Sequence, residues 1–184
     1  ARIGALRLPL DSNDSPKAAA KIAAKTLRKL EIEWPGKSRT FYAIGGTWRS
    51  LARLYLLETR HPVDVVHGFT IKGKAFSAFC GKVMEKPLDS FEFMDEISGN
   101  RKSLLPYGAA VMSAIIERFE VETVATAAVG LREGYLYSLL DDETRSKDAL
   151  LEATAELSIL RARSPQHSLE LAEWTDKAFE FLGL

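Results

Sequence analysis

The sequence predicts an α/β fold in which at least part of the sheet is parallel. Two short apolar segments, residues 41–44 and 121–129, each run into a glycine turn and then into a helical pattern. Strand, turn and helix in that order are typical of α/β units, because parallel strands need a crossover connection. A length of 184 residues fits one ordinary domain, or one domain and a fragment of another, and a content of 46% hydrophobic and 27% charged residues is typical of a globular protein with a core.

The first half of the chain is expected to alternate strands and helices. Residues 2–8 alternate in the manner of a strand. Ser15 as N-cap and Pro16 as the first helical residue predict a helix that continues over 18–30. Trp34-Pro35-Gly36 breaks that helix. The patterns that follow predict a strand at 41–44, a helix at 48–58 and a short strand at 69–71.

The second half predicts the remaining α/β elements and then a change of character. Helices are expected near 74–84, 90–97 and 109–119, a strand buried on both faces at 121–129, and a short helix at 135–140. The polar run 141–148 reads as a linker, followed by helical patterns at 149–161 and 168–181 with no strand between them. We therefore expect one domain at 1–142, and at 143–184 a linker and helical hairpin that open an all-helical domain.

Composition excludes several classes of function. Lys+Arg and Asp+Glu number 25 each, so no overall field attracts nucleic acid or an anionic membrane. No apolar run approaches the ~20 residues that span a bilayer. The single cysteine, Cys80, lies in an apolar helical run and is expected in the core, which fits a protein of the reducing cytoplasm.

The strongest functional signal is the Gly-Gly-Thr turn, residues 45–47. An apolar strand enters it, and a helix with Arg49 in its first turn leaves it. A helix N-terminus offers free backbone N–H groups to an anion, and two glycines allow a ligand to approach the backbone. Thr47 could cap the helix or bind a phosphate oxygen. An ordinary packing junction between strand and helix explains the same pattern about equally well.

Two further basic turns are expected on the same rim. Gly130-Leu131-Arg132-Glu133-Gly134 follows the second predicted strand, and Arg101 precedes a helix start. In a parallel sheet, turns at the carboxyl ends of strands converge, so the arginines favour a phosphate-rich ligand. For each arginine singly, including Arg132 with Glu133, a surface ion pair is the commoner explanation.

Catalytic groups are scarcer than binding groups. Asp11 and Asp14 lie in a predicted loop, where they could ligate Mg²⁺ or cap a helix. No Ser/His/Asp triad, zinc spacing or phosphate-binding Walker loop occurs. The residues by themselves thus predict anion binding without a visible catalytic base.

The order of these turns resembles the exopolyphosphatase / guanosine pentaphosphate phosphohydrolase (Ppx/GppA) family. The resemblance rests on Leu6-Arg7-Leu8 after a glycine, on residues 44–52, on Arg101 with 105–111, and on 130–137, and it covers most of 1–142. It implies a ribonuclease-H-like lobe of the actin, sugar-kinase and heat-shock ATPase superfamily. It further implies Mg²⁺-dependent removal of terminal phosphate from polyphosphate or guanosine pentaphosphate, a reaction linked to the stringent response.

The resemblance also assigns roles to residues. Gly45, Gly46 and Thr47 would line the phosphate cleft from the second lobe, with Arg49 behind them and Arg101 facing the phosphate chain. Residues 130–134 would support the fold, with Arg132 and Glu133 as supporting residues. Residues 149–184 are similar to the start of a helical domain that follows the two lobes.

The family's catalytic glutamate and the Asp-x-Gly-Gly-Gly-Ser loop are absent from this sequence. They belong to segments that would precede Ala1, so we expect a fragment that lacks the first lobe and is catalytically silent alone. Two alternatives stay open: a module that senses polyphosphate or guanosine tetraphosphate without cleaving it, and a structural role in which 151–184 mediates dimerisation. The expected partners are a phosphate chain or guanosine nucleotide, the missing first lobe and a second copy, but neither membrane nor nucleic acid.

Overall fold

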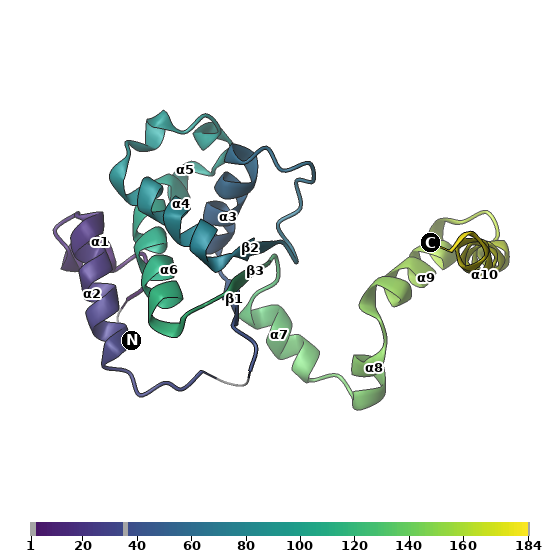
Figure 1. Ribbon diagram of the computed structural model, residues 1–184. Coiled ribbons are helices and arrows are strands. Elements are labelled where there is room, and N and C mark those ends of the chain that lie inside the picture. The colour runs from purple at the N-terminus through teal and green to yellow at the C-terminus, as the bar shows by residue number, and fades with distance from the viewer. Residues whose placement is uncertain (1–2, 35–36, 184) are drawn as a thin grey trace. The chain divides into compact units, whose positions relative to one another are not determined.

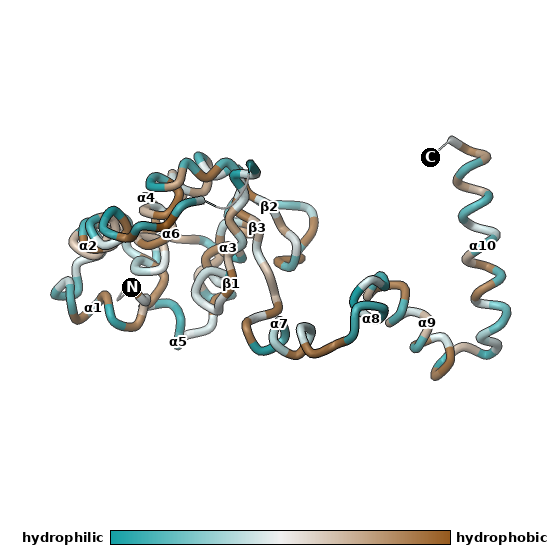
Figure 2. Tube along the Cα trace, turned by 90° about the horizontal axis from the view of Figure 1, so that it is seen from below, coloured by the Kyte–Doolittle hydropathy of each residue, from teal (hydrophilic) through white to brown (hydrophobic). Residues whose placement is uncertain are grey.

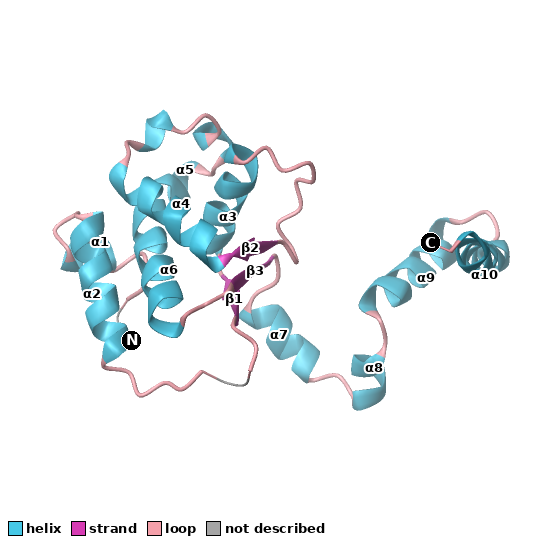
Figure 3. Cartoon of the chain, viewed as in Figure 1, coloured by secondary structure: helices cyan, strands magenta, loops and turns pink. Residues whose placement is uncertain are grey.

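The computed structural model describes residues 3–34 and 37–183 and divides the chain into two compact units, one ending at Arg132 and one beginning at Glu133 (Figure 1). The first unit combines a small sheet with several helices (Figure 3). In chain order its helices are α1 (Leu8–Asp11), α2 (Pro16–Arg28), α3 (Gly46–Glu58), α4 (Gly73–Glu85), α5 (Gly99–Lys102) and α6 (Leu105–Phe119), with two 3₁₀ turns, η1 (Leu88–Ser90) and η2 (Met94–Glu96).

The sheet has three described strands, in the order β1-β3-β2. β1 (Thr40–Ile44) runs parallel to β3 (Thr123–Ala127), and β2 (Thr70–Lys72) runs antiparallel to β3. The register pairs Ile44 with Ala127, so the carboxyl ends of β1 and β3 lie side by side. The parallel pair predicted from the two strand–turn–helix segments is therefore present, and it brings both glycine turns to one edge.

One face of the sheet is buried, and the other is open along β1. Side chains alternate along β1, where Ala43 is fully buried while Tyr42 is 68% and Ile44 50% exposed. Val124 and Thr126 on β3 continue the buried face. Strand β3 is buried over its three central residues, as the sequence predicts, but it is shorter than the predicted 121–129.

Helix α6 is the centre of the core. It packs against α2, α3 and α4, and most of its residues are buried. The buried residues of α2 are Ala19, Ala23 and Leu27, whose spacing of four places them on one face of the helix, and two of them are small alanines. The predicted start of α2 is confirmed, since Ser15 Oγ accepts a hydrogen bond from the N–H of Ala18 and Pro16 is the first helical residue.

Several predicted elements are wrong in detail. The described part of the strand expected at 2–8 is a turn followed by α1, because the N–H groups of Arg7 and Leu8 bond locally to Gly4 instead of to a neighbouring strand. Residue 2, like Pro35 and Gly36, lies outside the described residues. The helix expected at 90–97 is replaced by η1 and η2, whose local turns leave Phe91, Met94 and Ile97 in the core.

The second unit is helical throughout. It contains most of α7 (Leu131–Ser138), then α8 (Asp142–Ser146), α9 (Ala149–Arg161) and α10 (Pro165–Leu182). Helix α7 begins inside the Gly130–Gly134 segment, earlier than predicted. Helix α8 forms where a linker was expected, since Asp141 caps it by accepting a hydrogen bond from the N–H of Thr144.

None of the described side chains of this unit is buried. Hydrophobic and hydrophilic segments alternate along α10 (Figure 2), and Trp174 and Phe181 are 66% and 90% exposed. An amphipathic helix with this exposure has an apolar face that the other described residues of its own unit leave largely open. Within the described chain, no helix combines the length and apolar character needed to cross a membrane.

Candidate phosphate-binding site

The Gly-Gly-Thr turn forms the N-terminus of α3. Gly45 is the residue before the helix, with φ 134° and ψ 154°, a conformation that side-chain-bearing residues rarely adopt. No side chain caps α3, and its first turn contains no acidic residue. The first N–H groups of a helix have no partner within it, so this N-terminus presents uncompensated donors and the positive end of the helix dipole.

Arg101 lies directly against this turn. A Cβ placed on Gly46 would be 2.9 Å from Cζ and 3.0 Å from Nη2 of Arg101, so the guanidinium occupies the space that a side chain at residue 46 would fill. Among the described residues, no hydrogen bond or ion pair engages this guanidinium. The fold thus brings together two of the sequence-predicted features, the glycine turn and Arg101.

The neighbouring Lys102 does not share this freedom. Its ammonium group lies 2.8 Å from Oδ1 of Asp95, and this partner lowers the pKa of the Asp95 carboxyl. The pair links α5 to η2 at the surface. Of the two adjacent cations, Arg101 is therefore the one whose charge no described carboxylate offsets.

Thr47 and Trp48 attach the turn to α6. A Cβ on Gly108 would lie 2.5 Å from Cγ2 of Thr47, so α6 can approach the turn only because residue 108 is glycine. The indole Nε1 of Trp48 donates to the carbonyl oxygen of Gly108 over 3.2 Å, and Phe41 meets the indole ring edge-on at 5.5 Å between centroids. The methyl group of Thr47 therefore packs, and neither residue caps the helix.

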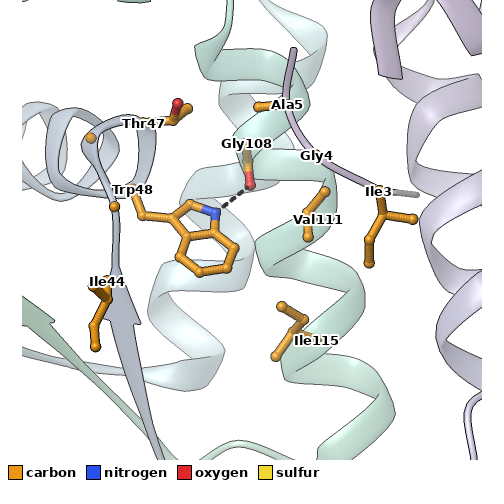
Figure 4. A pocket seen from close by; sticks show the side chains of 11 residues that line it. Ile3, Gly4, Ala5, Ile44, Thr47, Trp48, Gly108, Val111 and Ile115 are labelled. Carbon is orange, nitrogen blue, oxygen red and sulfur yellow. Dashed lines mark hydrogen bonds between the residues drawn. The ribbon is translucent and has the colours of Figure 1, made fainter. Parts of the chain in front are cut away.

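A cavity of about 330 Å³ opens beside the turn. Figure 4 shows Trp48 extending from α3 to α6, whose residues Val111 and Ile115 line the cavity. The segment before α1 and the end of β1 contribute the remaining wall. The described lining residues are Ile3, Gly4, Ala5, Ile44, Gly45, Gly46, Thr47, Trp48, Gly108, Val111 and Ile115.

Arg49 lies behind the turn and is engaged by the backbone. Its Nη1 donates to the carbonyl oxygen of Ala128, one residue beyond the end of β3. The guanidinium consequently ties the carboxyl end of β1 to that of β3. Phosphate binding by Arg49 stays a prediction, and this hydrogen bond gives the side chain a structural role as well.

Arg132 and Glu133 lie in the first turn of α7, and both are exposed. No hydrogen bond or ion pair joins the Arg132 side chain to a described residue, whereas Glu133 does interact with another group. Neither contributes to the cavity beside the Gly-Gly-Thr turn. Their supporting role in the site remains a prediction.

The candidates for other chemistry have structural partners. Asp11 accepts a hydrogen bond from Nε of Arg7 over 3.2 Å. Cys80 is fully buried, as predicted, and burial raises the pKa of its thiol, so it is not a nucleophile. Nowhere in the described segments do three or more His, Cys, Asp or Glu side chains come together in a way that could hold a metal ion.

Sequence reasoning missed the apolar half of the site. Trp48, Val111 and Ile115 have the spacing of ordinary core residues, and only the tertiary structure places them around a cavity. A weak signal was present in Gly108, a glycine near the start of a helix otherwise rich in apolar residues. Glycine inside a helix is costly and often marks a close approach of backbones.

Comparisons with known proteins agree with this architecture. Retrograde regulation protein 2 of Saccharomyces cerevisiae is 30% identical over 141 residues, which make up 68% of this chain and 24% of that protein. Guanosine-5'-triphosphate,3'-diphosphate pyrophosphatase of Aeromonas hydrophila subsp. hydrophila is 27% identical over 143 residues, 73% of this chain and 27% of that protein. The chain thus spans about a quarter of the length of these relatives.

Solved structures of the same fold include two phosphatase relatives. The type II variant of the Aquifex aeolicus Ppx/GppA phosphatase gives a TM-score of 0.56 at 23% identity, covering 73% of this chain and 46% of that one. An exopolyphosphatase-like protein gives 0.59 at 18% identity, covering 72% and 46%. The predicted fold class, an α/β lobe of the ribonuclease-H-like, actin-related kind, is thereby confirmed. Residues 2–143, most of the chain, match the Ppx/GppA phosphatase family, so the chain belongs to that family.

Proposed function

We propose that this chain is the phosphate-chain-binding lobe of a phosphohydrolase that removes terminal phosphate from inorganic polyphosphate, guanosine pentaphosphate or both. Family membership supports the reaction class, and the printed name of the Aeromonas relative supports a guanosine polyphosphate as one substrate. On this proposal Gly45, Gly46, Thr47 and Arg101 hold phosphate. Arg49 steadies the turn and can add a second positive charge at its rear.

The observation that carries the proposal is the guanidinium of Arg101 against Gly46. The Arg101 guanidinium, which no described side chain engages, lies against the N-terminus of α3, and the first turn of that helix contains no acidic residue. A phosphate group could accept hydrogen bonds from both sources at once. Such charge-assisted bonds are about twice as strong as neutral ones.

The chain is proposed to bind without turning substrate over. No described acidic residue lies in the first turn of α3 or lines the adjacent cavity. The family's catalytic glutamate belongs to a first lobe that would act as this chain's partner. The resemblance implies Mg²⁺, but the described carboxylates form no cluster that fits the ion. We therefore assign no step and no ligand of a metal to this chain.

Binding of tripolyphosphate in the presence of Mg²⁺, measured by calorimetry, tests the proposal. We expect saturable binding that Arg101→Glu weakens at least tenfold, since a hydrogen bond to a charged group is worth ~1.5–3 kcal/mol and ~1.4 kcal/mol is tenfold. Lys86→Glu is the matched control, because it makes the same change in charge at an exposed residue away from the turn. Equal affinities of the two variants would refute the assignment of Arg101.

Phosphate release tests the proposal that the chain alone does not hydrolyse its substrate. The chain incubated with polyphosphate and Mg²⁺ is expected to release no inorganic phosphate above a buffer control, measured by molybdate colour. Sustained release of phosphate that scales with protein concentration would contradict the expected lack of catalytic activity. Loss of that release in Arg101→Glu would then locate the activity at this site.

A second candidate is a module that senses polyphosphate or guanosine tetraphosphate without cleaving it. The yeast relative, named as a regulation protein, is the observation that favours it. The coding sequence upstream of Ala1 separates the two candidates. A first lobe with a glutamate at its cleft supports the enzyme, and a parent protein without that lobe supports the sensor. A role in the stringent response and a cytoplasmic location belong to either proposal.

A further inference from the structure

The charge of this chain is divided unevenly between its two units. Residues 1–132 contain 20 Lys and Arg side chains and 14 Asp and Glu, whereas residues 133–184 contain 5 and 11. The net charge of zero therefore combines a formal charge of +6 in the first unit with −6 in the second. Charge asymmetry between the halves of a chain is a signal of electrostatic interaction with a partner.

The positive charge of the first unit is concentrated on one exposed face of α2. The helix and its C-cap residue carry no carboxylate, and the buried residues of α2 lie on the opposite side. The basic face of α2 consists of Lys17, Lys21, Lys25, Arg28 and Lys29. Its four lysines follow one another at intervals of four residues, so they form a row along the helix. Among the described residues, only Lys17 of this face has an ion pair, with Glu85 over 3.4 Å.

The negative charge of the second unit forms a comparable row on α10, which carries four carboxylates and one lysine. Glu173, Asp176 and Glu180 are exposed, and none of them pairs with a cation in the described part of the chain. Helical periodicity places these three carboxylates beside the apolar side that carries Trp174 and Phe181. At ~1.5 Å per residue they extend over ~11 Å, and the last three lysines of the basic face over ~12 Å.

We propose that the basic face of α2 is a docking surface for α10 of a second copy of this chain. The charge pattern commits to this occupant, because the unpaired cations of one unit find carboxylates of matching extent on the other unit of an identical chain. A two-fold dimer, in which each copy docks its α10 on the other's α2, satisfies both faces. Complementary charges of this kind also fix the register of the contact.

Apolar contact supplies the affinity that charge alone does not. Exposed ion pairs are individually worth little, because water and salt screen them. Lysine side chains present long aliphatic stems below their ammonium groups. In the docked arrangement these stems cover Trp174 and Phe181, and ammonium groups near the indole face gain cation–π attraction. The apolar side of α10 and the unpaired lysines of α2 thus have one common partner.

Charge reversal of either face, followed by sedimentation velocity, tests the proposal. The triple variant Lys21→Glu, Lys25→Glu and Lys29→Glu is expected to weaken self-association at least tenfold, because it replaces attraction by repulsion. The triple variant of α10, in which the three unpaired carboxylates become lysines, is expected to do the same. A parent chain that stays monomeric at all concentrations would overturn the docking surface.

A matched control separates the position of the charges from their number. Replacing Lys72, Lys74 and Lys82 by Glu makes the same change in charge at three exposed lysines of the first unit. This variant is expected to associate at least as well as one with a reversed α2 and close to the level of the parent. A control as weak as the α2 variant would contradict a specific role for α2. A monomeric parent whose α2 variant loses tripolyphosphate affinity would assign the face to a phosphate chain instead.

Mixing the two triple variants gives the sharpest test. In the mixture each reversed face meets the reversed complement on the other chain, and the two native faces meet each other. We expect a one-to-one dimer in the mixture, although neither variant dimerises alone. Failure of the mixture to associate, with both variants folded by circular dichroism, would overturn the pairing of α2 with α10.

The parent chain itself keeps the proposal testable if a variant does not fold. Raising NaCl from about 0.05 M to about 1 M shortens the Debye length to ~3 Å. The dimer of the parent chain is expected to dissociate more readily at the higher concentration. Self-association that does not respond to salt would contradict a contact between charged faces.

Discussion

At the scale of single residues, the site depends on three glycines that have no side chain. Gly46 makes room for a guanidinium, and Gly108 makes room for a methyl group of the turn. Gly45 supplies a backbone angle that other residues rarely adopt. Three glycines of one small region thus have three separate physical roles, and a substitution at each is expected to have a different effect.

Gly46→Ala separates binding from stability. The new Cβ would lie 2.9 Å from the end of the Arg101 side chain, which can swing away, so the fold should survive with Arg101 displaced. We expect tripolyphosphate affinity to fall about tenfold with little change in melting temperature, since one charge-assisted contact is lost. Gly81→Ala in α4 is the control, as its Cβ would meet open space. Unchanged affinity in Gly46→Ala would show that the position of Arg101 is unimportant.

Cys80 is expected to be unreactive in the folded chain. It is fully buried and burial raises the pKa of its thiol, so both access and thiolate formation are disfavoured. Labelling with iodoacetamide at pH 8 should be slow in buffer and at least a hundredfold faster in denaturant, as followed by mass spectrometry. Rapid labelling of the native chain would mean that α4 opens locally.

At the scale of elements, the contact between α3 and α6 determines the shape of the site. Trp48 and Thr47 reach α6 at the same residue, Gly108, and the cavity lies beside this crossing. The sheet contributes the second constraint, since Arg49 on α3 holds the residue after β3. The turn between them is therefore fixed from two sides.

Gly108→Ala tests the crossing of these helices. A Cβ 2.5 Å from Cγ2 of Thr47 cannot be accommodated by a short, branched side chain, so the helices must separate. Overpacking of this kind costs ~1–3 kcal/mol, which urea denaturation would measure. Gly134→Ala in the exposed α7 should be neutral or slightly stabilising, because nothing lies near its Cβ and alanine favours a helix. A Gly108→Ala variant as stable as the parent would mean that the crossing tolerates a wider spacing.

At the scale of the whole molecule, two units differ in how they bury apolar surface. The first unit has a core centred on α6, whereas the second leaves large apolar side chains of α9 and α10 exposed. Net charge is zero, so no overall repulsion opposes association. The homodimer expected from the sequence remains a prediction that this surface supports.

Sedimentation velocity tests self-association. The sedimentation coefficient is expected to rise with protein concentration, and a double variant, Trp174→Glu with Phe181→Glu, should restore a concentration-independent monomer. Tyr42→Glu, on the open face of the first unit, is the control for added negative charge. A parent chain that stays monomeric at all concentrations would rule out the dimer.

Most elements of the first unit could be predicted, because their signals are local. Ser15-Pro16 specifies a helix start through its own hydrogen bond and ring, and the strand 41–44 is followed by glycines that only a turn requires. The predictions of a strand at 2–8 and of a helix at 90–97 were wrong for a shared reason. Their apolar residues are buried by partners distant in sequence, and short apolar patterns do not reveal which backbone conformation those partners select.

The sequence by itself determined the family, the α/β class and the turn at residues 45–47, since backbone conformation at glycine and at helix starts depends on near neighbours. Only the tertiary structure decided which arginine is held by the backbone and which is left available for an anion. Arg49 is engaged by the carbonyl of Ala128, and Arg101 lies unengaged on Gly46. Both have the same chemistry, and their different surroundings come from packing between segments far apart in the chain.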